Sequence, residues 1–208
     1  PNGVCPPIDS NRIVINGQTA THDALGVEDV EVYLEDMDAP TPITRMTDGE
    51  GFYQMYVSAG PDYRLTPYKN DDVLNGVNTM DILMIQQHIL GLNEITDPYN
   101  LIAANVNDDT RITGGDLIDL RKVILGIETT FPSNESWRFV DAVEQLEAGV
   151  LPVDYAESIE VLDIQSNVSD QDFVAVKIGD VDGSAIPNNL VSQEAEGRSG
   201  ALVLNAQD

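Results

Sequence analysis

The sequence is poor in basic residues, has one cysteine and contains no long apolar run. Its 208 residues include 10 Lys+Arg against 36 Asp+Glu, which gives a net charge of −26. Clustered basic residues are the electrostatic footprint of proteins that bind nucleic acids or anionic membranes, so we expect neither partner. Without an apolar run of about 18 residues, membrane insertion is not expected either.

The single cysteine, Cys5, cannot form a disulfide within the chain. It stands beside Pro6 and Pro7, in a stretch of residues 1–10 that we expect to be a linker. The thiol is therefore expected to be free or to pair with another chain. The chain starts at Pro1 and shows no signal segment, which is typical of a mature segment or a fragment.

Motifs that mark common enzymes are also missing. The sequence has no Gly-rich phosphate loop and no zinc-type Cys/His spacing. His22 and His88 are the two histidines, and neither has a nucleophile motif beside it. Among 36 acids, carboxylate pairs occur by chance and do not indicate hydrolase chemistry. We therefore expect no catalytic residues, and we expect His88 to be a satisfied helix histidine.

The chain has a large excess of acidic residues, and its overall composition is that of a globular protein. A hydrophobic content of 42% and an aromatic content of 6% are typical of a folded protein. Carboxylates crowded on a compact fold repel one another, and bound divalent cations offset that repulsion. Two bound Ca²⁺ would move the net charge only from −26 to −22, so most of the acids are expected on a solvated surface.

Residues 11–68 show short strands separated by turns, which indicates a small antiparallel β-sandwich. Residues 26–34 form a gly-val…val-x-val-x-leu strand, residues 48–53 an Asp-Gly-x-Gly-x-Tyr hairpin and residues 60–63 a Gly-x-x-Tyr strand. These motifs resemble those of the Cna B-type and carboxypeptidase-regulatory-like prealbumin sandwiches. The resemblance implies a fold and says almost nothing about chemistry.

Residues 69–126 contain an internal repeat with an offset of 35 residues, which aligns Asp81 with Asp116. After each aspartate, apolar residues recur at helical spacing as far as Gly91 in the first copy and Gly126 in the second. The repeat therefore predicts two helices that each end before a glycine.

Each predicted helix follows a 12-residue loop rich in oxygen-bearing side chains. Side-chain oxygens fall at positions 1, 3, 9 and 12 of both loops and at position 5 of the second, which is the spacing of EF-hand calcium loops. Ca²⁺ takes six to eight oxygens at about 2.3–2.6 Å, and position 7 supplies a backbone carbonyl. The predicted Ca²⁺ ligands are Asn70, Asp72, Gly76, Asn78 and Asp81 in loop one (residues 70–81), and Asn105, Asn107, Asp109, Arg111, Thr113 and Asp116 in loop two (residues 105–116).

Loop spacing, duplication and helix pattern together resemble type I dockerin modules over residues 70–126. The chain departs from that family in having Asn at position 1 of both loops. Position 6 is Asn75 or Thr110 instead of Gly, which we expect to require a left-handed or strained backbone. Position 5 of loop one is Leu74, which has no side-chain oxygen. With two carboxylates per loop, we expect calcium affinities in the micromolar to millimolar range.

Other interpretations of the loops stay open. Both could be polar loops that only cap helices, or loop one could bind nothing. Loop one could also recruit an outside ligand in place of Leu74, either Asp71 or a distant acid. Asp180, Asp182 and Ser184 form a dockerin-like half-loop, which could complete loop one, bind a third ion or be an ordinary acidic turn.

Residues 127–186 are expected to form an extension that packs on the dockerin-like unit. Within it, residues 136–140 and 159–164 are predicted to be extended. The capping-box pattern of residues 169–172 predicts a helix over residues 173–178, although the β-branched content there allows a strand. Residues 187–208 are predicted to be a linker or, through residues 201–204, a strand for a neighbouring subunit or domain.

The sequence thus predicts an α+β fold in which a small antiparallel, prealbumin-like β-sandwich is fused to a dockerin-like calcium module. The expected function is a non-enzymatic, calcium-stabilised structural or adhesive module of a secreted or cell-surface bacterial protein, able to self-associate into a filament or to bind other surface domains. The alternative is a recognition module that anchors a larger protein to a cohesin-bearing scaffold. Against it, loop positions 10 and 11 are Thr79-Met80 in one repeat and Gly114-Gly115 in the other.

Overall fold

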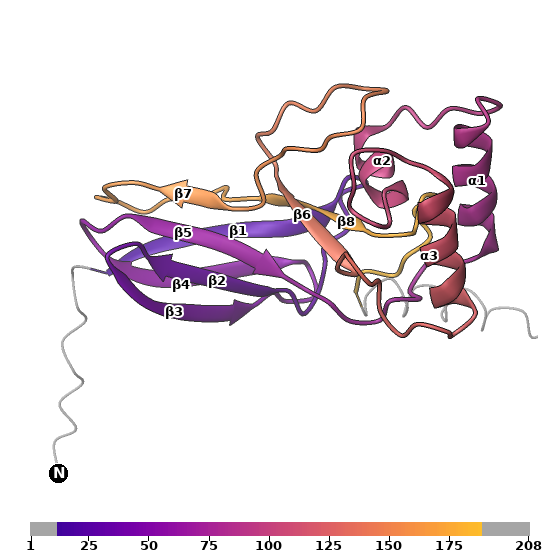
Figure 1. The fold of residues 1–208 in the computed structure, drawn as a ribbon. Helices are drawn as coiled ribbons and strands as arrows, with labels where there is room; N and C mark the ends of the chain where they lie inside the picture. The colour runs from indigo at the N-terminus through magenta and orange to yellow at the C-terminus, as the bar shows by residue number, and fades with distance from the viewer. Residues whose placement is uncertain (1–11, 189–208) are drawn as a thin grey trace, which may run out of the picture.

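The computed structural model describes residues 12–188, which form two four-stranded sheets and three short helices. The protein is therefore an α+β protein with a β-sandwich-like core. Figure 1 shows the sheets extending to one side of the molecule and the helices gathered at the other. In this part of the chain, the helices are too short and too polar to cross a membrane. The expectations for Cys5 and residues 201–204 lie outside the described residues.

The first sheet has the order β4-β1-β8-β6. Strand β1 (Arg12–Thr21) pairs antiparallel with β4 (Phe52–Ser58) along most of its length. The end of β1 pairs parallel with β8 (Phe173–Lys177), which in turn pairs antiparallel with β6 (Trp137–Asp141). The sheet thus joins strands from the two ends of the described chain.

The second sheet has the order β3-β2-β5-β7 and is antiparallel throughout. Its strands are β2 (Glu31–Asp36), β3 (Ala39–Met46), β5 (Tyr63–Tyr68) and β7 (Ile159–Val161). The turn at residues 47–51 connects β3 to β4, which belong to different sheets. The motif at residues 48–53 is therefore a crossover between sheets and not the expected hairpin.

The C-terminal strands correct two expectations. Strands β6, β7 and β8 extend the two sheets, so the β-sandwich is not confined to residues 11–68. Residues 173–177 form strand β8 and not the predicted helix. The β-branched Val174 and Val176 favour a strand. The capping-box residues before them lie alongside β1, with Gln171 N donating to Asn16 O at 3.2 Å and a left-handed backbone at Asp170 (φ 60°).

Alternating residues of both sheets fill the space between them. The core contains β-branched and aromatic side chains from β1, β2, β4 and β5, closed by side chains from β6, β7 and β8. Tyr53 is among its largest fully buried side chains, and its hydroxyl donates a hydrogen bond to the Gln171 carbonyl. The segment before β8 is therefore hydrogen-bonded to a side chain of the sandwich core.

Three helices form a second core against the other face of β6 and β8. Helices α1 (Thr79–Ile89) and α3 (Gly114–Ile124) match the two helices predicted from the repeat. Helix α2 (Pro98–Ala104) comes between them in the sequence and had no counterpart among the predicted elements. Asp97 is its N-cap, and Pro98 is its first residue. Val174 and Val176 of β8 pack against this cluster, while Phe173 and Ala175 belong to the sandwich core.

Tyr53 provides a test of this architecture. We expect Tyr53→Phe to lower the free energy of unfolding by about 1–3 kcal/mol, because it removes the donor from the part-buried carbonyl of Gln171. The matched control is Tyr56→Phe on the same strand, whose exposed hydroxyl accepts from Gln54 Nε2 at 2.7 Å. Urea unfolding should show a change below about 0.5 kcal/mol for the control. Equal losses of stability in the two variants would show that the hydrogen bond from Tyr53 to Gln171 does not stabilise the fold.

Candidate metal centre

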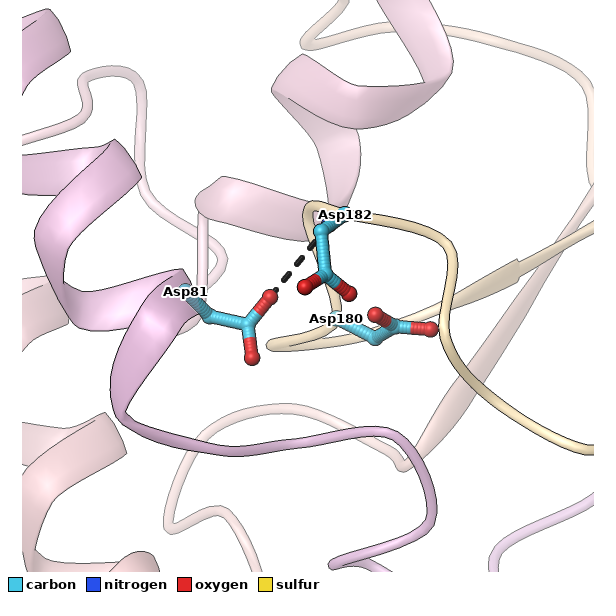
Figure 2. A group of neighbouring side chains, drawn as sticks. All are labelled: Asp81, Asp180 and Asp182. Carbon is cyan, nitrogen blue, oxygen red and sulfur yellow. Dashed lines mark hydrogen bonds between the residues drawn. The ribbon is translucent and has the colours of Figure 1, made fainter.

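Three aspartates from distant parts of the sequence converge at the start of helix α1. One carboxylate oxygen from each of Asp81, Asp180 and Asp182 lies within 4.8 Å of the others. Asp81 belongs to the first turn of α1, and the other two belong to the segment that follows β8 (Figure 2). Asp81 and Asp180 are buried, whereas Asp182 is exposed.

Backbone amides hold these carboxylates in place. Asp81 Oδ2 accepts from Asn78 N at 2.8 Å, and Asp81 Oδ1 accepts from Val181 N at 2.8 Å and from Asp182 N at 3.3 Å. Asp180 Oδ1 accepts from Ser184 N at 3.0 Å, and its Oδ2 accepts from Ala185 N at 2.8 Å. The carboxylates are thus oriented by the chain itself.

Three further oxygens, from Gly76, Asn78 and Ser184, belong to the same hydrogen-bond network. The Gly76 carbonyl accepts from Ser184 Oγ at 2.9 Å and from Asn78 Nδ2 at 2.8 Å. Asn78 is also the N-cap of α1, and its side-chain oxygen accepts from Met80 N at 2.8 Å. We call this set the split site, because its residues come from two separate segments: Gly76, Asn78, Asp81, Asp180, Asp182 and Ser184.

Loop two forms a similar frame from a single segment, and we call it the contiguous site. Asp116 Oδ2 accepts from Thr113 N at 2.7 Å, and its Oδ1 accepts from Asn107 N at 3.1 Å. Asn105 Oδ1 and Asn107 Oδ1 each accept from Asp109 N at 3.2 Å. The structure therefore brings the predicted side chains of loop two together around one helix start.

The two sites correspond position by position. In each, the position-12 aspartate accepts from the position-9 amide with one oxygen and from the position-3 amide with the other. In each, the position-5 amide donates to the side chains at positions 1 and 3. Position 4 has a left-handed backbone in both, with φ 71° at Gly183 and φ 55° at Asp108. Residues 180–184 therefore occupy positions equivalent to 1 to 5 of loop two, and residues 76–81 occupy positions 7 to 12.

The first half of loop one is not part of the split site. Asn70 Oδ1 accepts from Ser136 N at 2.9 Å, and Asp72 lies beside the ammonium group of Lys177. Asp71, the neighbouring acid considered as a replacement ligand, pairs with Lys69 at 3.0 Å. Residues 180–184 take the places predicted for Asn70, Asp72 and Leu74, and Ser184 supplies the oxygen that Leu74 lacks.

The backbone expectation for position 6 also needs correction. Neither Asn75 nor Thr110 has a positive φ; the left-handed residues are Asp72 and Gly76 in loop one, at positions 3 and 7, and Asp108 in loop two, at position 4. Arg111, at position 7 of loop two, is exposed, and its amide donates to Asp109 Oδ1 at 2.7 Å. Its side chain can therefore stay in water while its carbonyl serves the loop.

Burial is the main electrostatic feature of both sites. It raises the pKa of Asp81 and of Asp116, and it raises the pKa of Asp180 to about 6. A carboxyl whose pKa is raised on folding stabilises the fold at low pH, and that contribution is lost as the pH rises through the folded-state value. Without a compensating cation, the ionised sites therefore cost folding free energy at neutral pH.

A buried lysine neighbours the split site. Burial lowers the pKa of Lys177 to about 8, against the raising effect of Asp180, Asp72 and Asp71. Its Nζ donates to the Val73 carbonyl at 3.0 Å. The segment that was predicted to supply the first metal ligands thus accepts a hydrogen bond from an internal ammonium group.

The donor set of the split site suits a hard cation. Two ligands of one Ca²⁺ lie at most about 5 Å apart, because each bond is about 2.3–2.6 Å long. The three carboxylate oxygens of Asp81, Asp180 and Asp182 meet this limit, and the other donors are also oxygens. The site could therefore hold a metal ion.

Comparisons with known proteins add little. No protein-family model matches the chain, and no curated protein matches it. A solved structure of a DUF3823 family protein from Parabacteroides merdae ATCC 43184 is similar at 17% sequence identity, with a TM-score of 0.25. That match covers 31% of this chain and 35% of the other, so it spans about a third of either protein and carries no argument about function.

Gly76 gives a test of how residues 180–186 pack on loop one. Gly76 (φ 77°) and Gly91 (φ 64°) both have left-handed backbones, so alanine at either should cost about 1–2 kcal/mol. A Cβ at Gly76 would lie 2.5 Å from Ala185 N, whereas nothing lies within 4 Å of one at Gly91. We expect Gly76→Ala to cost about 1–3 kcal/mol more than Gly91→Ala in urea unfolding. Equal costs would contradict the observed packing.

Proposed function

We propose that this chain is a non-enzymatic structural or adhesive module, stabilised by Ca²⁺ and located outside the cell or on its surface. The observation that carries the proposal is the correspondence between the split and contiguous sites. Two different stretches of chain, one of them interrupted by about a hundred residues of sequence, build the same frame of oxygens around a helix start. An acidic turn formed by chance would not reproduce the amide contacts to Asp81 and Asp116.

Calcium is the ion that this donor set favours. The split site offers six oxygens, three of them from carboxylates, and Ca²⁺ accepts six to eight oxygens in flexible geometry, whereas Mg²⁺ demands a near-ideal octahedron. The contiguous site has two carboxylates, Asp109 and Asp116, so we propose that it binds more weakly. Affinities of about 0.1–1 mM are typical of extracellular modules, which supports a location where free calcium is abundant.

The surroundings of the sites support a structural role. An ion in the split site would join the start of α1 to the segment after β8, and thereby the helical unit to the first sheet. The histidines have structural partners: His88 Nδ1 accepts from Ile95 N at 3.1 Å, and His22 stacks on Tyr99 with 5.9 Å between ring centroids. Both contacts favour packing roles over catalysis.

Calcium binding can be measured by calorimetry on the full chain. We expect two ions to bind the wild type, and one to bind each of Asp182→Ala and Asp109→Ala, because each substitution removes one carboxylate from one site. Both residues are exposed, so neither change should prevent folding. The matched control is Asp154→Ala, an exposed acid outside both sites, which should keep two ions.

Two outcomes of this titration would count against the proposal. Wild-type protein that takes up no calcium at millimolar concentrations would contradict it outright. If Asp182→Ala still binds two ions and Asp72→Ala binds only one, the first ion is held by residues 70–81 as predicted from the sequence, and the split site is wrong.

The alternative function, a recognition module for a cohesin-bearing scaffold, is favoured by one observation. Exposed apolar residues on and after α1 recur 35 positions later on and after α3, as in the repeat. A matched pair of apolar patches on two helices offers a protein partner a surface. The pairs are Leu83 with Ile118, Leu90 with Leu125, and Leu92 with Ile127.

Electron microscopy and binding to purified cohesin domains separate the two functions. Under the structural proposal, which includes self-association, we expect filaments or oligomers in calcium that disperse on chelation. Under the alternative, the protein stays monomeric and binds a cohesin. Replacing Leu83 and Ile118 by Asp should then abolish that binding. Monomers that bind a cohesin would contradict self-assembly as the function.

A further inference from the structure

The end of the described chain runs across the junction between the helices and the sheets. We call residues 178–188 the C-terminal arm. Next to helix α1, Val181 N and Ser184 Oγ bond to Asp81 and Gly76 of the split site. Further along, Ile186 exchanges two hydrogen bonds with the side chain of Asn75, at 2.8 and 2.9 Å. The arm therefore follows the second half of loop one.

The last residues of the arm return to the β-sandwich. The Pro187 carbonyl accepts from Glu28 N at 3.0 Å, and Asn188 Nδ2 donates to the Gly26 carbonyl at 2.6 Å. The arm thus contacts the helical unit through loop one and the sandwich through the segment before β2. It adds a further connection between the two parts of the fold to those made by β6 and β8.

Apolar packing under the arm is incomplete. An open pocket of about 340 Å³ lies between the arm, loop one and the sandwich, with Asp71, Asn75, Trp137 and Ile186 among its lining residues. Within residues 12–188, the buried indole N–H of Trp137 has no hydrogen-bond partner. Beside this pocket, the hydrogen bonds of Ile186, Pro187 and Asn188 hold the outer part of the arm, whereas Val181 packs into the helical core next to the split site.

The two metal sites differ in what has to fold before they exist. All ligands of the contiguous site lie within twelve residues, so this site can form once α3 starts. The split site needs Asp180 and Asp182 next to Asp81, which requires β8 to be paired with β1 and β6. Closing so long a loop costs chain entropy, which only later contacts can offset.

We propose that the split site is a calcium-dependent clasp for the C-terminal arm, and this inference rests on the proposed calcium binding. Calcium binds only when the arm is closed on loop one, and by the same linkage it holds the arm closed. Calcium loss releases the arm while leaving the sandwich and α3 folded. The contiguous site stabilises only its own loop and helix.

Hydrogen exchange measured by mass spectrometry on the full chain tests the clasp. At free calcium of about 100 times the dissociation constant, opening of the arm should become about 100-fold rarer than in chelator. Amides of residues 75–81 and 178–188 should slow accordingly. Amides of β4, remote from both sites, should exchange at the same rate with and without calcium.

Matched variants assign the effect to one site. Asp182→Ala should abolish the calcium-dependent slowing in the arm and keep it in residues 105–116, whereas Asp109→Ala should do the reverse. Ser184→Ala, which removes the hydroxyl bonded to the Gly76 carbonyl, should reduce the slowing in the arm as a second, milder lesion. Calorimetry on the same samples reports ion binding independently of exchange.

The outcomes separate the clasp from calcium binding itself. Two ions bound in calorimetry without any slowing in residues 178–188 would overturn the clasp and leave the proposed function standing. Slowing of the arm that Asp109→Ala removes as completely as Asp182→Ala would also overturn it. No ion bound in calorimetry would overturn both proposals.

Discussion

Strand β8 has to bury both of its faces, and the rest of the structure depends on this constraint. Phe173 and Ala175 point into the sandwich, and Val174 and Val176 pack against the helical unit. A one-residue shift would move Phe173 and Ala175 to the helical side and the two valines into the sandwich, where neither set matches the shape of the existing packing, so the end of the strand is held at one place. Asp180 follows three residues after that strand, which positions it beside the start of α1.

The contact between the segment after β8 and the start of α1 carries an electrostatic cost. Buried carboxylates at Asp81, Asp116 and Asp180 cost free energy when ionised, as their raised pKa values show. Backbone amides offset part of the cost, and Lys177 places one internal positive charge nearby. A bound divalent cation would offset the remainder locally. It would change little in the overall charge of −26, which a solvated acidic surface has to carry.

Local patterns predicted the local structure well. Period-two alternation within residues 26–34 located β2, whereas β3 had no counterpart among the predicted elements; the repeat located α1, α3 and the frame of loop two. The helix predicted over residues 173–178 was wrong because a capping-box pattern is also compatible with an extended segment, and β-branched residues favour the strand. Helix α2 has seven residues, too few to show a helical period.

Loop one shows where local patterns end. Its twelve residues have the spacing of metal ligands. In the structure, however, residues 180–184, about a hundred positions away, lie beside Asp81 where the first half of the loop was expected. Two signals in the sequence pointed this way: Leu74 has no oxygen to offer, and the half-loop at Asp180 has no helix behind it. The sequence left three interpretations of residues 180–184: they could complete loop one, bind a third ion or form a simple turn. The pairing of β8 places these residues beside Asp81, and no local sequence pattern predicts that pairing.

The position of bound calcium is the most direct test of the split site. Crystals grown in calcium and measured at a long X-ray wavelength would reveal the ions by anomalous scattering. One peak should lie among Asp81, Asp180, Asp182 and the Gly76 carbonyl, and a second inside loop two. A peak bound by Asn70 and Asp72, or no peak beside Asp180, would contradict the split site.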